Sequence, residues 1–94
     1  MLAEVKSALR VDGNEHDVEV QGLIDAAMAD LALSGVEASK AKDTEDPLIK
    51  RAIIIYCRAH FDYDDKSADR LLMSYDMLKS HLTLADDYRT VTEA

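Results

Sequence analysis

The sequence predicts an all-α fold, a small bundle of about four helices with a polar, flexible C-terminal tail. Two observations carry this prediction. Residues 48–61 are apolar on almost every side, and they follow Asp46 and Pro47, which suit the N-cap and the first position of a helix. Apolar residues also recur every three or four positions within 14–34 and 65–83, which is the spacing of a helix with one buried side.

The first predicted helix spans residues 2–10. Leu2, Val5 and Leu9 recur at helical spacing, so one side of this short segment is apolar and the other is polar. A turn is expected directly after it, because Gly13 is free to adopt a positive φ angle. The turn separates this helix from a longer one.

The second predicted helix runs to about Ser34. Asn14 is its expected N-cap, and Gly35 is its expected terminator. The polar residues 36–45 that follow are expected to form an exposed, mobile loop. The expected buried side of this helix consists of Val20, Leu23, Ile24, Ala27, Met28 and Leu31.

Residues 47–61 form the central helix of the predicted bundle. A buried strand is the competing interpretation of residues 52–56, which read Ala-Ile-Ile-Ile-Tyr. The length of the apolar run and its Asp-Pro start favour a helix, because buried strands are shorter and Pro suits a helix start. We therefore expect this segment to be largely buried.

The last predicted helix has Asp65 and Ser67 as alternative caps. The polar residues after it suggest a domain at residues 1–85 and a flexible tail at 86–94. Residues 88–92 suit a strand, but only in a pair with another chain, because no other strand is predicted. The expected buried side of the last helix consists of Ala68, Leu71, Leu72, Tyr75, Leu78 and Leu82.

Composition limits the classes of function. The 94 residues include 19 acidic and 11 basic side chains, a net charge of −8, which argues against a nucleic-acid binder that relies on a basic face. The single cysteine, Cys57, excludes an internal disulfide and favours a reducing compartment. We expect no signal peptide, because the first residues lack a basic region followed by an apolar run. We also expect no membrane span, which needs about 20 apolar residues.

Residues that usually carry chemistry are scattered along the chain. His16, His60 and His81 have no partner at metal-ligand spacing, and Cys57 lies in the predicted buried helix. The acidic run from Asp62 lacks the Gly and Glu that an EF-hand loop needs at its sixth and twelfth positions. We therefore expect no enzymatic activity, no cofactor and no metal site.

Some apolar residues lie on helix sides that should face solvent. Ile54 lies between Lys50 and Arg58 at one-turn spacing, and three residues of the last helix lie nearly opposite its apolar stripe. A helix with apolar residues on two opposite sides packs on both, and in a domain this small the second neighbour is often another subunit. The alternative is that single exposed apolar residues need no explanation. The candidate subunit-interface residues are Ile54, Met73, Met77 and Leu84.

An ordered set of segments resembles the small head–tail connector proteins of tailed bacteriophages and prophages, which are often labelled DNA-packaging or head-completion proteins. The segments are Leu-Arg-Val-Asp at 9–12, Leu-Ile-Asp-Ala-Ala at 23–27, Asp-Pro-Leu-Ile-Lys-Arg-Ala-Ile-Ile-Ile-Tyr at 46–56 and Tyr-Asp-Met-Leu-Lys-Ser-His-Leu at 75–82. The similarity covers nearly the whole chain, through about Tyr88. The order of the segments carries it, since no single motif is diagnostic.

The resemblance implies a subunit of a homo-oligomeric ring that docks on the phage portal protein after DNA is packaged. Such a ring extends the DNA channel and binds a downstream stopper or tail-completion protein. Packaged DNA would pass without specific binding, and an acidic wall suits this because like charges repel. The implied location is the virion neck at the head–tail junction, after assembly in the host cytoplasm, with no membrane partner and no catalytic residues. By analogy, residues 86–94 form a docking arm, with Tyr88, Arg89 and Val91 as candidate portal contacts.

A small helical DNA-binding or regulatory module is the alternative function. It predicts a basic recognition helix, such as the second helix of a helix-turn-helix motif. The most basic patch in this sequence is only Lys50, Arg51 and Arg58. Tight, salt-sensitive binding to duplex DNA would favour this alternative over the connector.

Overall fold

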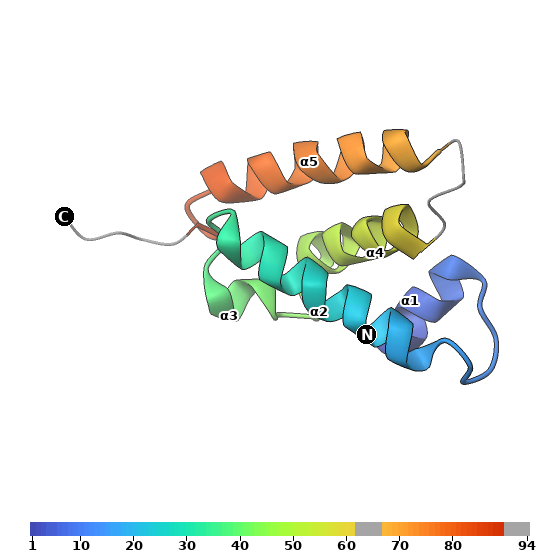
Figure 1. Cartoon of the computed structure of the whole chain (residues 1–94). Coiled ribbons are helices and arrows are strands. Elements are labelled where there is room, and N and C mark those ends of the chain that lie inside the picture. The colour runs from blue at the N-terminus through green and yellow to red at the C-terminus, as the bar shows by residue number, and fades with distance from the viewer. Residues whose placement is uncertain (62–66, 90–94) are drawn as a thin grey trace.

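The computed structural model describes residues 1–61 and 67–89. Helix α4 lies in the middle of the domain, and α1, α2 and α5 pack around it (Figure 1). An isolated β-bridge joins Val36 and Arg89, and the described residues form no strand. The all-α prediction is therefore confirmed. The described helices are α1 (Leu2–Leu9), α2 (Asp17–Leu33), α3 (Ala38–Ala41), α4 (Pro47–Phe61) and α5 (Ala68–Leu84).

Helix α4 begins where the sequence predicts. The Asp46 carboxylate oxygen Oδ1 accepts hydrogen bonds from the backbone N–H groups of Leu48 at 2.9 Å and Ile49 at 3.3 Å. This cap satisfies two of the donors that have no partner inside the helix. The helix contributes more of the core than any other element, with six buried residues: Ile49, Ala52, Ile53, Ile55, Cys57 and Ala59.

The start of α2 corrects the prediction of an Asn14 cap. The backbone carbonyl of Asn14 accepts a hydrogen bond from the N–H of Asp17 at 3.3 Å, which makes residues 14–17 a turn. Helix α2 therefore begins only at Asp17, with His16 in the N-cap position. Its end agrees with the prediction, because Gly35 has a φ angle of 119° and stops the helix.

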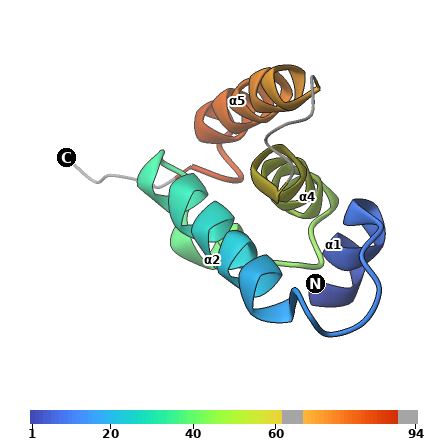
Figure 2. The same cartoon turned by 45° about the vertical axis from the view of Figure 1, so that its right-hand side comes forward.

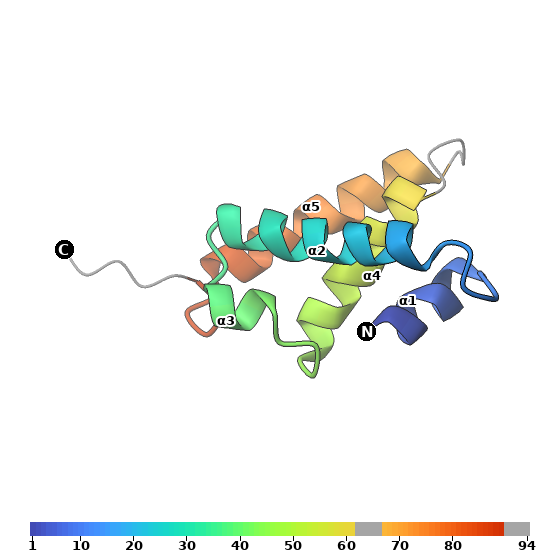
Figure 3. The same ribbon diagram turned by 60° about the horizontal axis from the view of Figure 1, so that its bottom comes forward.

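Residues 36–45 are not the exposed loop that we expected. They contain helix α3, which Glu37 caps by accepting a hydrogen bond from the N–H of Lys40 at 3.2 Å. Val36 and Ala41 are only 1% exposed and belong to the core. Burial of these two apolar residues on either side of the cap explains why the segment folds onto the end of α2 (Figure 3).

The three larger partners of α4 lie on different sides of it. Figure 2 shows α2 on one side, with α1 and α5 flanking α4 on two others. Val20, Ile24, Ala27 and Leu31 of α2 are buried, as predicted, while Leu23 and Met28 are partly buried at the edge of the core. On α5, Ala68, Tyr75 and Leu82 are buried, and Leu71 and Leu78 pack against the core at its edge. Leu48, Arg51 and Arg58 of α4 are exposed, so one side of α4 is left uncovered by the described helices.

Residues 86–89 contact the domain. The N–H of Glu37 donates to the carbonyl of Tyr88 at 2.6 Å, next to the bridge between Val36 and Arg89. The partner that we expected from another chain for this stretch is therefore Val36 of the same chain. The boundary that we place between a domain at 1–85 and a tail at 86–94 stays a prediction, and residues 90–94 lie outside the described part.

Candidate interaction surfaces

The described residues hold no cluster suited to metal binding. No group of three or more His, Cys, Asp or Glu side chains in residues 1–61 and 67–89 is arranged to hold a metal ion. Burial raises the pKa of the Cys57 thiol to about 12, so this side chain remains protonated and unreactive at neutral pH. None of the described helices has the length and apolar character needed to cross a membrane.

Two of the histidines pack against aromatic rings. The imidazole of His16 meets the ring of Phe61 edge-on at 5.5 Å, and its Nδ1 atom lies 3.5 Å from the carboxylate of Glu19. The imidazole of His60 lies 4.1 Å from the ring of Tyr56. These contacts fix the ends of α2 and α4 and give neither histidine a metal-binding geometry.

The outward side of α5 is the first candidate surface. Met73, Met77 and Leu84 are 66%, 63% and 76% exposed, and their spacing of four and seven residues places them on one side of the helix. We call these three residues the α5 patch. The patch faces away from the buried Tyr75 and Leu82, as the sequence predicted. Its role as a subunit interface stays a prediction.

The open side of α4 is the second candidate surface. Two adjoining hollows of about 390 and 760 Å³ share Ile54, Arg58 and Leu71, and their walls come from α1, α4 and α5 together with Glu45 and Arg10, with no residue of α2. We call the two hollows together the α4 groove. Ile54 is half-buried there, so this candidate interface residue lies in a depression and does not project. The remaining lining residues are Ala8, Leu9, Pro47, Lys50, Arg51, Ile55, Phe61 and Ser74.

The α4 groove is basic in a protein that is strongly acidic overall. Arg10, Lys50, Arg51 and Arg58 line it, against the single carboxylate of Glu45. Lys50 is paired with Glu4 of α1 at 3.0 Å. Within residues 1–61 and 67–89 the three arginines make no ion pair. The groove therefore combines an apolar floor with positive charge available to a partner.

The outward side of α2 is a third surface, and sequence reasoning missed it. Val18 and Leu33 are each 88% exposed, and Gly22 and Ala29 are exposed between them on the same side of the helix. We call these four residues the α2 face. The available signal was that Val18 and Leu33 lie outside the buried stripe of α2 formed by Val20, Ile24, Ala27 and Leu31.

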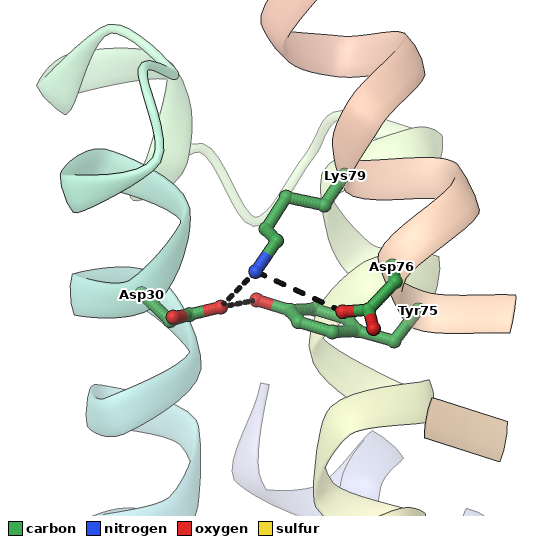
Figure 4. Close-up of polar contacts among 4 residues, drawn as sticks. All are labelled: Asp30, Tyr75, Asp76 and Lys79. Carbon is green, nitrogen blue, oxygen red and sulfur yellow. Dashed lines mark hydrogen bonds and ion pairs between the residues drawn. The ribbon is translucent and has the colours of Figure 1, made fainter. Parts of the chain in front are cut away.

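Helices α2 and α5 are joined by a polar cluster (Figure 4). The hydroxyl of Tyr75 donates to Oδ2 of Asp30 at 2.5 Å, and Nζ of Lys79 donates to the same oxygen at 3.1 Å. Burial opposes ionisation of Asp30, but these two hydrogen bonds and the charge of Lys79 outweigh it and lower the pKa of the carboxyl. Burial and the hydrogen bond to Asp30 raise the pKa of Tyr75. The cluster fixes the distance between the two outward surfaces.

Only two of the three candidate portal contacts fall on described residues. The hydroxyl of Tyr88 donates to Oδ2 of Asp46 at 2.9 Å, and Nζ of Lys40 lies 5.7 Å from the centre of its ring. This hydrogen bond, more than burial, raises the pKa of Tyr88. Arg89 is exposed and pairs with Asp86 at 2.8 Å. Val91 lies outside the described residues. Of the other two, Tyr88 contacts its own domain, and Arg89 is exposed with its guanidinium paired to Asp86.

A comparison with protein-family models gives one match. The family described as "Phage connector protein" matches residues 1–89, which include all five described helices and the Val36–Arg89 bridge. No curated protein and no solved structure matches the chain significantly.

Proposed function

Because the chain belongs to the phage connector protein family, and is thus a structural connector component of a phage, we propose that it forms a ring at the head–tail junction of a tailed phage or prophage. The ring docks on the portal protein after DNA packaging, extends the DNA channel and binds a stopper or tail-completion protein below it. The observation that carries the proposal is the family match over every described helix.

The charge and surfaces of the protein support this role. A net charge of −8 gives a channel wall that repels the DNA backbone, so DNA slides past it without specific binding. A closed ring needs a heterologous interface, in which one patch of a subunit meets a different patch of the next. The described residues offer several exposed apolar surfaces, which suits assembly with other subunits.

We assign the candidate subunit contacts to two of these surfaces. Ile54 acts from within the α4 groove, and Met73, Met77 and Leu84 act as the α5 patch. Methionine suits such a contact, because its unbranched side chain adapts to the shape of a neighbour. The assignment predicts that association, and not folding, depends on these exposed side chains.

We assign portal docking to residues 86–94, with Tyr88, Arg89 and Val91 as the contacts. Arg89 is exposed, and its guanidinium pairs with the exposed Asp86 in the single chain, a contact that a partner's carboxylate would replace. An exposed guanidinium suits the bidentate recognition of a carboxylate on a portal subunit. The binding site for the downstream protein would then lie on the opposite end of the ring.

The proposal is tested by measuring assembly of the purified protein by sedimentation velocity, alone and with isolated portal rings. We expect a ring-sized species, formed alone or only on the portal, and packaged heads without tails when the protein is omitted from assembly reactions. A strict monomer that never joins the portal would overturn the proposal. A duplex-DNA band shift in low salt is the control, since tight and salt-sensitive binding would support the DNA-binding alternative instead.

A further inference from the structure

We infer that the α4 groove of one subunit receives the α2 face of the next copy of this chain. The inference rests on the proposed ring and names the two surfaces that meet in it. Both surfaces are exposed in the single chain, and no described helix covers either of them. They are also different surfaces, as a heterologous contact requires.

Charge is segregated between the two surfaces. Residues 11–39, which contain α2, include seven acidic residues and no Lys or Arg, whereas the α4 groove is lined by four basic residues and one acidic one. A groove with unpaired arginines therefore has a complementary surface on every other copy of the chain. Complementary charge steers association and fixes its register. Of these seven, Glu19 and Asp25 are exposed beside the α2 face, whereas Asp17 and Asp30 pair with Lys6 and Lys79 of the same chain.

The apolar parts of the two surfaces also match. The α2 face projects Val18 and Leu33, 15 residues apart, which corresponds to about 22 Å along a helix. The α4 groove follows α4 from Pro47 to Phe61, which corresponds to about 21 Å. Gly22 has no side chain and Ala29 has a small one, so α2 can approach the floor of the groove closely at these positions. The apolar residues of α2 that lack a partner in the single chain would be covered along their full length.

The position of the surfaces gives a head-to-tail arrangement. Residues of α1, α4 and α5 line the groove and none comes from α2, which packs on a different side of α4 (Figure 2). A subunit that accepts a neighbour's α2 in its groove therefore keeps its own α2 free for a further copy. Repetition of this contact produces a chain of subunits that closes into a ring when the rotation allows.

A nucleic-acid backbone is the competing occupant of a basic groove. A phosphate backbone is bound by clustered cations and needs no apolar surface. The α4 groove, in contrast, has an apolar floor lined by Ile54, Leu71 and Phe61. The net charge of −8 also repels nucleic acid at long range. The apolar α2 face, with Glu19 and Asp25 exposed beside it, satisfies both components of the groove, and a phosphate backbone satisfies one.

Charge reversal tests the pairing. One variant carries Arg51→Glu and Arg58→Glu in the groove, and the other carries Glu19→Lys and Asp25→Lys beside the α2 face. All four positions are exposed, so circular dichroism should show intact helices. We expect each variant alone to associate at least tenfold more weakly than the native protein, because like charges then meet. An equimolar mixture should regain association, because every contact in an alternating arrangement is again between opposite charges.

Chemical cross-linking tests the geometry directly and does not depend on stable rings. Val18→Cys and Ser74→Cys are made in separate proteins, which are mixed and treated with a short bis-maleimide. The buried Cys57 should not react. We expect a covalent dimer from the mixture, in at least fivefold greater yield than from either protein alone, and loss of this dimer when the groove carries the two Glu substitutions.

The outcomes separate this inference from the proposed function. If the native protein forms rings or joins the portal, and both reversed variants do the same, the groove pairing is wrong while the connector role stands. If the mixture does not regain association, or the cross-link does not form, the pairing is likewise wrong. If the groove variant loses binding to duplex DNA while its self-association is unchanged, the occupant of the α4 groove is a nucleic acid and not α2. A native protein that never associates, with itself or with the portal, would overturn the proposed function.

Discussion

Helices α2 and α5 have the same length, 17 residues, and pack on the same central helix, yet they present different outward surfaces. The α2 face consists of the branched side chains of Val18 and Leu33, which are conformationally stiff, and of Gly22 and Ala29, which have little or no side chain. The α5 patch is built mainly from Met73 and Met77, whose side chains adapt to their neighbours. A stiff surface suits a contact repeated identically around a ring, and an adaptable one suits a contact whose geometry varies. Each of the four predictions below concerns one of these two helices or the polar cluster that joins them.

The largest effect is expected at the link between the two helices. Tyr75→Ala removes a buried ring and leaves Asp30 and Lys79 without their shared partner, so the free energy of unfolding should fall by about 3–5 kcal/mol. Tyr75→Phe keeps the ring and loses only the hydroxyl, which should cost about 1–2 kcal/mol. Urea unfolding followed by circular dichroism measures both. Equal losses in the two variants would show that packing of this ring contributes little.

Next in size is the loss of association through the α5 patch. Met73→Asp combined with Met77→Asp should weaken association about 10- to 100-fold, because charge replaces apolar contact area at an interface. The free energy of unfolding should change by less than about 0.5 kcal/mol, because both side chains are exposed. Met73→Leu with Met77→Leu is the matched control and should retain association. If the Asp variant unfolds, these residues belong to the core, and the contrast between the outward surfaces of α2 and α5 is wrong.

The Asp30–Tyr75 hydrogen bond should also make stability depend on pH at both extremes. The folded-state pKa of Asp30 is lowered, so its contribution is present above its ordinary value of 3.8 and is lost as the pH falls below it. The folded-state pKa of Tyr75 is raised, so its contribution is present below its ordinary value of 10.0 and is lost as the pH rises above it. Thermal unfolding across pH measures both arms.

Tyr75→Phe is the control for this dependence. It should flatten the alkaline arm, because the variant has no hydroxyl to ionise at this position. The acid arm should also become shallower, since Asp30 then keeps only Lys79 as a partner. An alkaline arm of unchanged steepness would assign the effect to the other tyrosines.

The smallest effect is expected on the α2 face. A methyl group at Gly22 would meet no atom of its own chain within 4 Å, so Gly22→Ala should raise the free energy of unfolding by about 0.5–1 kcal/mol through helix propensity. The same change should leave association unchanged or weaken it slightly, because it thickens the surface where a neighbour would approach. Chemical denaturation and sedimentation velocity on the same samples separate the two effects. Lower stability in the Ala variant would mean that the chain needs glycine here for its own fold.

The sequence predicted an element correctly where a local signal, such as a cap residue, agreed with the spacing of the apolar residues. Asp46 and Pro47 define the start of α4, and the spacing of Val20, Ile24 and Leu31 defines the buried side of α2. The start of α2 was misplaced because Asn14 forms a turn through its backbone carbonyl, which its residue type does not reveal. The segment 36–45 was misplaced because burial of Val36 depends on residues more than 50 positions away.

The candidate surfaces were predicted to different extents. The α5 patch follows from helical periodicity alone, since Met73 and Met77 lie opposite the core stripe. The hollow around Ile54 does not, because its walls come from three helices whose packing no local pattern specifies. Interface and portal-docking roles for these residues stay predictions, as does the tail at 86–94.

The two oxygens of the Asp46 carboxylate serve different parts of the chain. One caps the start of α4, and the other holds the hydroxyl of Tyr88, which lies 42 positions later. Mechanically, tension applied to the segment that follows Tyr88 would pass through this hydrogen bond and the Val36–Arg89 bridge into the rigid core before it reached α5. If a connector is pulled at that segment, the force would reach the central helix α4, and α5 would not be detached from the domain first.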